Sequence, residues 1–154
     1  MDTEELAFLR TVPCFRGLPT AELIQVQRGV RRRELRAGEL IVRAGQRADT
    51  LYVVRRGHVQ LAVPTVGGTE RVLAVQGPGS TFNETAVCGG GPAATTARAL
   101  GANTCIDEVP AALVSHLLAD HPRLGAHLVQ AEARHIRRLA ALIGDRAWDD
   151  SARR

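Results

Sequence analysis

Apolar residues recur with helical spacing over the first thirty positions. Leu6 and Leu9 lie one turn apart, and Leu23 and Val26 repeat that spacing after the segment GLPTAEL at 17–23. The proline, threonine and glutamate of that segment favour the N-terminus of a helix. The pattern therefore predicts short helices before residue 30.

From Val30 onward the spacing changes from helical to that of short strands. Runs of β-branched and aliphatic residues follow one another, with glycine turn signals between them. The runs span 40–42, 51–54, 59–63, 72–75, 95–100 and 105–109. Short strands spaced this evenly favour an antiparallel barrel or roll over a sheet of βαβ units. The predicted fold class is mainly β with flanking helices.

After Pro110 the pattern becomes helical again, with a short helix at 111–119 and a long one from Pro122 to about Ala147. Two adjoining apolar seams follow the long helix at heptad spacing: Leu128, His135 and Leu142 form one, and Val129, Ile136 and Ile143 form the other. A helix with two seams can pack on its own domain and on a partner at once, so we expect a homodimer through this C-terminal helix. A helix packed only on its own roll is the alternative.

Composition limits the chain to one domain with an appended helix. Of its 154 residues 45% are hydrophobic, which is enough for one core. The formal charge is +4, and all 20 basic residues are arginines because the sequence contains no lysine. This balance is compatible with an acidic partner such as DNA without requiring one.

The cysteine spacing and the hydropathy of the chain bear on the cellular compartment in which we expect the protein. Cys14, Cys88 and Cys105 are an odd number without CxxC spacing, which argues against a disulfide framework or a zinc knuckle. No apolar run approaches the roughly 18 residues that a bilayer span requires, and the acidic start MDTEEL is unlike a signal peptide. We expect a cytoplasmic protein with no membrane contact.

The segment 78–99, PGSTFNETAVCGGGPAATTARA, has the outline of a phosphate-binding cradle. It contains a turn, a short helix start, a glycine-rich loop and small hydroxyl residues that enter a strand. A phosphate site usually adds a fixed cation to such backbone donors. Nothing from Pro78 to Ala97 is positively charged. The frame of the cradle is therefore present without its counter-ion.

Five short motifs follow the order of helix, strands, glycine loop, strands and long helix. They are FRGL from Phe15, GELIV from Gly38, GQRADTLYVV from Gly45, GHVQL from Gly57 and PGSTFNETAV from Pro78. Together they resemble the cyclic nucleotide-binding domain of Crp/Fnr transcription regulators. The resemblance covers about residues 15–150. It implies an antiparallel double-stranded β-helix, which is a jelly-roll-like β-roll, followed by a long C-terminal dimerisation helix.

The resemblance also divides the chain. It implies N-terminal helices and a cyclic nucleotide-binding-like β-roll over 1–121, the dimerisation helix over 122–147 and a hinge stub over 148–154. In such regulators a winged helix-turn-helix follows, and GDRAWDDSARR resembles the hinge that leads to it. Contact with DNA is expected only through a helix-turn-helix domain that this chain lacks.

Relatives that bind cyclic AMP carry the cassette F-G-E and, after a loop, R-[ST]-A. Their arginine holds the phosphate and their glutamate takes the ribose 2'-hydroxyl. Here the frame is Phe82, Asn83 and Glu84, with asparagine in the glycine slot, and Ala93 and Ala94 fill the arginine and serine slots. A hydrogen bond to a charged group contributes about 1.5–3 kcal/mol, so losing the arginine weakens cyclic nucleotide binding roughly tenfold to over a hundredfold. We expect weak or absent cyclic AMP binding.

The long helix departs from the same relatives. Their adjacent hydroxyl residues meet the adenine across the dimer, and the matching Leu139 and Ala140 cannot form those hydrogen bonds. His135 falls where relatives place a basic residue, so we expect a contact with Glu84; a place in the dimer seam is the alternative. Asn83 is expected to cap the short helix, or else to donate to a ligand. The predicted site for a small-molecule effector comprises Phe82, Asn83, Glu84, Thr85, Ala93, Ala94, Thr95, Thr96, His135, Leu139 and Ala140.

Other functions have less support in the sequence. An iron–sulfur cluster needs a cysteine cluster near the N-terminus, where only Cys14 stands, and haem is kept as a minor alternative because it needs only one or two ligands. Pro122 separates His116, His121 and His127, so no metal site is predicted. Nothing resembles an activated nucleophile, and no enzyme is expected. The alternative function is a ligand-independent dimerisation or protein-interaction module.

Overall fold

Two antiparallel sheets face each other and enclose a core. The structure is a computed structural model that describes the backbone of residues 3–152 and the side chains of residues 3–144. Within that range one sheet has the strand order β1 (Arg31–Leu35), β8 (Thr104–Pro110), β3 (Thr50–Arg56) and β6 (Thr81–Phe82). The other has the order β2 (Leu40–Val42), β7 (Thr96–Ala99), β4 (Val59–Pro64) and β5 (Glu70–Gln76). The predicted β-roll is confirmed.

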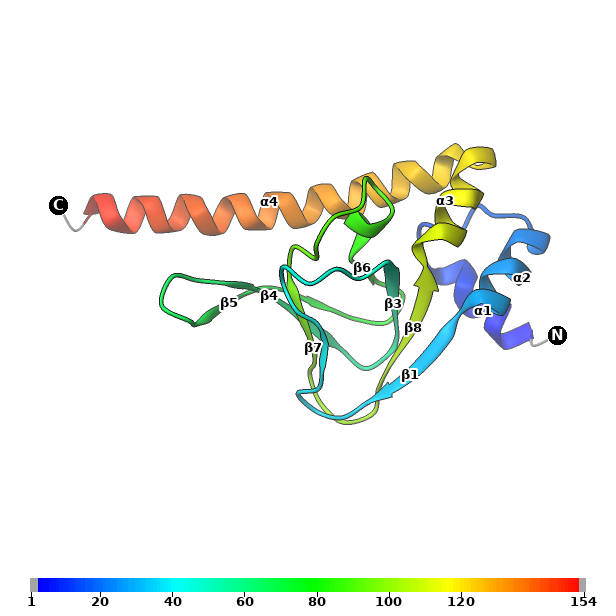
Figure 1. Ribbon diagram of the computed structural model, residues 1–154, viewed down its shortest axis with the longest axis horizontal. Coiled ribbons are helices and arrows are strands. Elements are labelled where there is room, and N and C mark those ends of the chain that lie inside the picture. The colour runs from blue at the N-terminus through cyan, green and yellow to red at the C-terminus, as the bar shows by residue number, and fades with distance from the viewer. Residues whose placement is uncertain (1–2, 153–154) are drawn as a thin grey trace.

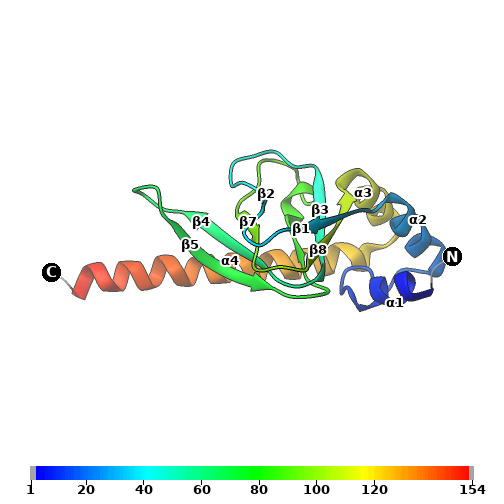
Figure 2. The same cartoon turned by 90° about the horizontal axis from the view of Figure 1, so that it is seen from below.

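Four α-helices flank the roll in the described part of the chain (Figure 1). They are α1 (Thr3–Thr11), α2 (Thr20–Gly29), α3 (Ala111–Asp120) and α4 (Pro122–Ala152). α1 and α2 lie at one end of the roll, and α4 runs along it and extends past the β4–β5 hairpin (Figures 1 and 2). α4 packs on β5 and on the short 3-10 helix η1 (Glu84–Ala86). Because η1 belongs to the predicted cradle at 78–99, α4 packs directly against that cradle.

The long helix ends later than the sequence analysis expects. It runs to Ala152, whereas the predicted end was Ala147, so 148–152 is helical. No proline interrupts 123–152, and a single glycine near the predicted end, Gly144, is insufficient to break the helix. The last two residues of the expected hinge, 153–154, lie outside the described residues.

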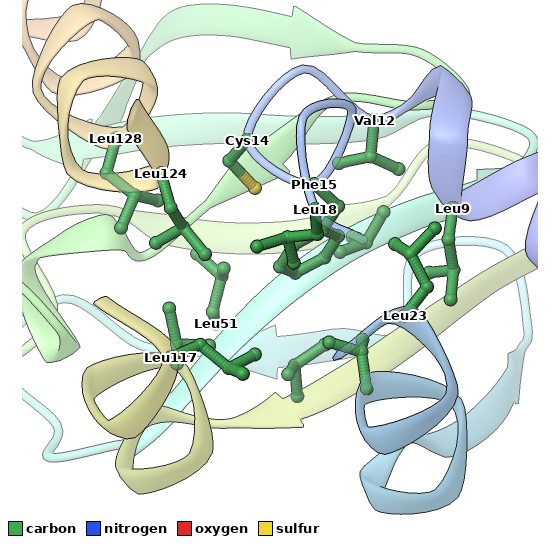
Figure 3. Packing of buried hydrophobic residues seen from close by; sticks show 14 of the residues in the cluster. Leu9, Val12, Cys14, Phe15, Leu18, Leu23, Leu51, Leu117, Leu124 and Leu128 are labelled. Carbon is green, nitrogen blue, oxygen red and sulfur yellow. The ribbon is translucent and has the colours of Figure 1, made fainter. Parts of the chain in front are cut away.

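Two apolar cores lie on either side of the first sheet. One joins the N-terminal helices, α3 and the start of α4, and Figure 3 shows Phe15, Leu51, Leu117, Leu124 and Leu128 within it. The other fills the roll between its two sheets, and its members include Val54, Ile106, Leu61 and Ala97. The first core anchors the start of α4 to the roll, because Leu124 and Leu128 are almost fully buried there.

Strand β1, RRREL, was absent from the predicted strands because it shows no apolar alternation. It pairs with β8, and ion pairs compensate the charges of Arg32, Arg33 and Glu34. Arg32 contacts Asp107 at 3.0 Å and Glu5 at 2.7 Å, and Arg55 contacts the same two carboxylates at 3.3 and 2.7 Å. Asp107 is nearly fully buried, so two guanidinium groups compensate its charge. This cluster ties α1 to the roll.

None of the helices in the described range has the length and apolar character that crossing a bilayer requires.

Candidate functional site

The turn into η1 uses Asn83 in a position that normally favours glycine. Its backbone is left-handed, with φ of 66°, and asparagine tolerates that conformation better than most residues do. The side-chain Nδ2 donates to the carbonyl oxygens of Ala48 at 3.1 Å and Thr50 at 2.8 Å. It makes no capping hydrogen bond to η1, so the predicted cap is wrong. The amide instead fastens η1 to the start of β3.

Glu84 is fully buried at the start of η1. Its Oε1 accepts a hydrogen bond from Thr81 Oγ1 at 2.8 Å. Its Oε2 lies 3.6 Å from His135 Nδ1 and accepts no hydrogen bond from any described residue. The predicted contact between Glu84 and His135 is confirmed. A buried carboxylate of the roll therefore meets an imidazole of α4.

A second carboxylate, Glu132, lies next to this pair and was missed by the sequence analysis. Ligand atoms of Glu84, Glu132 and His135 all lie within 4.8 Å of one another. Burial raises the pKa of Glu132, and the neighbouring Glu84 raises it further, both through its charge and because a protonated Glu132 can donate to it, while His135 acts in the opposite direction. The spacing Glu132-x-x-His135, which puts both side chains on one face of a helix, was the available signal.

The other ring nitrogen of His135 faces β5. Gln76 Nε2 lies 3.4 Å from His135 Nε2 and also donates to the carbonyl oxygen of Thr81 at 2.9 Å. His135 thus contacts Glu84 through one nitrogen and Gln76 through the other. His135 therefore links α4 to both η1 and β5.

A cavity of about 60 Å³ lies between η1, the segment just before β7, and α4. Seven of the predicted site residues line it: Asn83, Glu84, Thr85, Ala94, Thr95, His135 and Leu139. The remaining walls are Leu61, Val63, Leu73, Glu132 and Ile136. These five residues were not among the predicted site residues because they come from β4, β5 and α4, far from the cassette in sequence. The structure thus brings most of the predicted residues together around one space.

Four predicted residues lie elsewhere. Phe82 points into the roll core and stacks on Tyr52, with ring centroids 4.9 Å apart. Ala93 is buried in the same core. Thr96 Oγ1 accepts from the backbone N–H of Ala44 at 3.0 Å, and Ala140 is exposed on α4. Ala94 and Thr95 lie in the bend before β7 and both line the cavity, whereas the neighbouring Ala93 packs in the roll core and Thr96 begins the strand.

The cavity wall holds no arginine among the described residues. Arg98 on β7 is the basic residue that follows the cassette most closely in sequence. Its guanidinium group lies 3.7 Å from the carboxylate of Glu70, which is on β5, beyond β4 in the same sheet. Arg134 and Arg138 line a neighbouring pocket of about 380 Å³ beside Pro78 and Gly79, on the far side of His135. The cavity therefore has no countercharge for a phosphate, and its volume is far below the roughly 300 Å³ at which small-molecule pockets begin.

The two seams of α4 have different surroundings. Leu128 is fully buried and His135 is mostly buried against the roll, so the first seam packs on its own domain. The second seam is exposed in the monomer, with Val129 at 62%, Ile136 at 58% and Ile143 at 64% exposure. An apolar ridge at heptad spacing is typical of a helix that pairs with another helix.

Comparisons with known proteins agree with this architecture. The sequence profile described as the cyclic nucleotide-binding domain matches residues 32–121. A cyclic nucleotide-gated potassium channel of Mesorhizobium japonicum is 34% identical over 88 residues, which are 57% of this chain and 23% of the channel. The cyclic AMP receptor protein of Thermus thermophilus is 38% identical over 72 residues, 47% of this chain and 33% of the receptor.

Solved structures give the same result. The crystal structure of the Thermus thermophilus catabolite activator protein superposes with a TM-score of 0.70 at 30% identity, covering 86% of this chain and 62% of that protein. The chain spans a quarter to a third of the length of the two curated relatives above. The match is thus to one domain within larger proteins.

Proposed function

Because the chain belongs to the cyclic nucleotide-binding domain family, we propose that it is the effector-sensing and dimerisation domain of a Crp/Fnr-like transcription regulator, with weak or no cyclic AMP binding. One observation carries this proposal. Glu84, the counterpart of the family's ribose-binding glutamate, is fully buried and contacts His135 on α4, while the cavity beside it has no arginine.

The position of α4 supports a sensing role. His135 and Leu139 close the cavity from α4, and Glu84 closes it from η1. Anything that enters the cavity must therefore alter the contact between His135 and Glu84 or the packing of Leu139. If α4 can adopt two positions on the roll, a ligand that binds one of them more tightly shifts the equilibrium toward that position. The size of the shift is set by the difference between its two affinities. The exposed seam of the same helix carries that shift to a partner.

A second candidate function is a dimerisation module that senses no ligand. The observation that favours it is the small cavity of about 60 Å³, in which Glu84 already has Thr81 and His135 as neighbours. In this alternative the buried contacts keep α4 permanently seated. The exposed seam would then be the whole functional surface.

Isothermal titration of the chain with cyclic AMP and cyclic GMP tests the first part of the proposal. We expect no saturable binding in the low micromolar range, and a tighter dissociation constant would contradict it. A thermal-shift screen over nucleotides and small acids separates the two candidates. Reproducible stabilisation by one compound supports a sensor, since a ligand stabilises the state that it binds.

A further inference from the structure

The buried end of the cavity gathers three groups that can bind a metal ion. Glu84 contributes a carboxylate from η1, and Glu132 and His135 contribute a carboxylate and an imidazole from α4. Their ligand atoms lie within 4.8 Å of one another, and His135 Nδ1 is 3.6 Å from Glu84 Oε2. Donors bound to one tetrahedral ion at about 2.0–2.2 Å are themselves about 3.3–3.6 Å apart. The Glu84–His135 separation thus already falls at that spacing.

An unpartnered buried oxygen points to a ligand at the same place. Glu84 is fully buried, and its Oε2 accepts no hydrogen bond from the described residues. Thr85 Oγ1, which is also buried without a hydrogen-bond partner, belongs to the next residue and lines the same cavity. A buried carboxylate oxygen without a hydrogen-bond partner destabilises the folded state. A cation bound to that oxygen would remove this cost.

We propose that Glu84, Glu132 and His135 bind a divalent first-row transition-metal ion, with Zn²⁺ as the reference ion. The inference rests on the proposed function, because the ion would be the effector that seats α4 on the roll. Two carboxylates and a neutral imidazole balance the charge of a divalent ion.

The donor set selects the class of ion. Two oxygens and one imidazole nitrogen suit Zn²⁺, Co²⁺ and Mn²⁺, while Mg²⁺ and Ca²⁺ favour sites made of oxygen alone. The Glu132-x-x-His135 spacing presents a carboxylate and an imidazole from adjacent helical turns, as in the carboxylate metal sites of helical bundles. Asn83 and Thr85 line the same cavity and supply further polar atoms beside the three ligands.

Neighbouring groups orient the ligands. Thr81 Oγ1 donates to Glu84 Oε1 at 2.8 Å, which leaves Oε2 directed at His135. Gln76 lies beside His135 Nε2, so Nδ1 is the nitrogen available to the ion. Partners of this kind fix the orientation of metal ligands, and their loss weakens binding about 10–100-fold.

Titration of the EDTA-treated 154-residue chain with ZnCl2 tests the site. We expect one Zn²⁺ per chain, and we expect Glu132→Gln and His135→Ala each to weaken its affinity by at least about tenfold. The matched control is the pair of His121 and Glu22, whose Nε2 and Oε1 also lie 3.6 Å apart. His121→Ala and Glu22→Gln should leave Zn²⁺ affinity unchanged.

Co²⁺ provides a second readout, since its visible spectrum reports the ligand field directly. We expect d–d bands in the wild-type chain that Glu132→Gln removes, while circular dichroism shows both proteins equally folded. Absence of stoichiometric Zn²⁺ binding, or equal affinity in wild type and both site variants, overturns the inference.

The two proposals fail differently. If Zn²⁺ binds at the site without changing the oligomeric state or the thermal stability of α4, the metal site stands and its role as effector is wrong. If Zn²⁺ does not bind, the metal inference alone fails, because the cyclic nucleotide titration and the dimer measurement do not depend on it.

Discussion

Asn83 Nδ2 donates to the carbonyl oxygen of Thr50 at 2.8 Å while the Asn83 backbone is left-handed. The side chain thus compensates for the strain of its own conformation. We expect Asn83→Ala to lower the free energy of unfolding by about 2–3 kcal/mol, because it loses two hydrogen bonds and tolerates positive φ poorly. Asn83→Gly, which adopts positive φ freely, should lose about 1–2 kcal/mol. Urea denaturation measures both, and an equal loss would contradict the role of the backbone.

Ala94 lines the cavity, whereas Ala93 is buried in the roll core. The resemblance had placed the family's arginine at Ala93. We instead expect Ala94→Arg to raise cyclic AMP affinity by about 10–100-fold, since a charged hydrogen bond contributes about 1.5–3 kcal/mol. Ala93→Arg, the matched control, should mainly destabilise the fold because it buries an unpaired charge. Calorimetric titration with cyclic AMP and a melting curve of each variant distinguish the two substitutions. If Ala93→Arg raised the affinity and Ala94→Arg did not, the arginine slot would be Ala93, as the resemblance implied.

The β-roll could be predicted from the sequence because its strands carry the apolar residues that fill the core. Glycine turns between those runs marked the boundaries. β1 escaped prediction because Arg32 and Arg33 are paired with Glu5, Asp107 and Glu108, which lie far away in sequence. Only the register with β8 reveals that these charges are paired.

The candidate site was predictable only in part, for a related reason. The cassette positions follow from the local segment, and the Glu84–His135 contact followed from a family position. Whether Ala93 or Ala94 faces the cavity depends on the bend at 94–95 before β7, whose conformation the local sequence does not reveal. Glu132 acquires its surroundings only when α4 seats on η1, so its position depends on tertiary packing rather than on local pattern.

Gly57, in the turn between β3 and β4, has φ of +77° and lies against β8. A Cβ atom there would approach the Cα of Thr104 to 2.9 Å. Gly38 has the same φ, but a Cβ atom at Gly38 meets nothing within 4 Å. We expect Gly38→Ala to cost about 1 kcal/mol from backbone strain alone, and Gly57→Ala to cost about 1–3 kcal/mol more. Chemical denaturation measures the difference; equal losses would contradict the steric argument.

Cys14 lies in the core that anchors α4 (Figure 3). Burial, and then the charge of Glu84, raises the pKa of its thiol from 9.0 to about 12. The folded state thus favours the neutral thiol, so the stability that this group contributes is complete below pH 9 and is lost as the pH rises toward 12. Between about pH 8 and about pH 10.5 we expect the wild type to lose about 2 kcal/mol more than Cys14→Ala does. Parallel pH profiles for the two proteins would contradict this assignment.

Ile136 and Val129 form one exposed ridge of α4, while Leu128 on the adjoining seam is buried. This division suits a helix that pairs with a second copy of itself. We expect Ile136→Glu to raise the dimer dissociation constant at least about a hundredfold, because an unpaired carboxylate would be buried at the interface. Gln130→Glu adds the same charge at an exposed position beside the ridge and should leave the dimer intact. Sedimentation equilibrium measures both constants. A wild-type chain that sediments as a monomer, or an Ile136→Glu dimer as tight as wild type, would exclude this face of α4 as the contact.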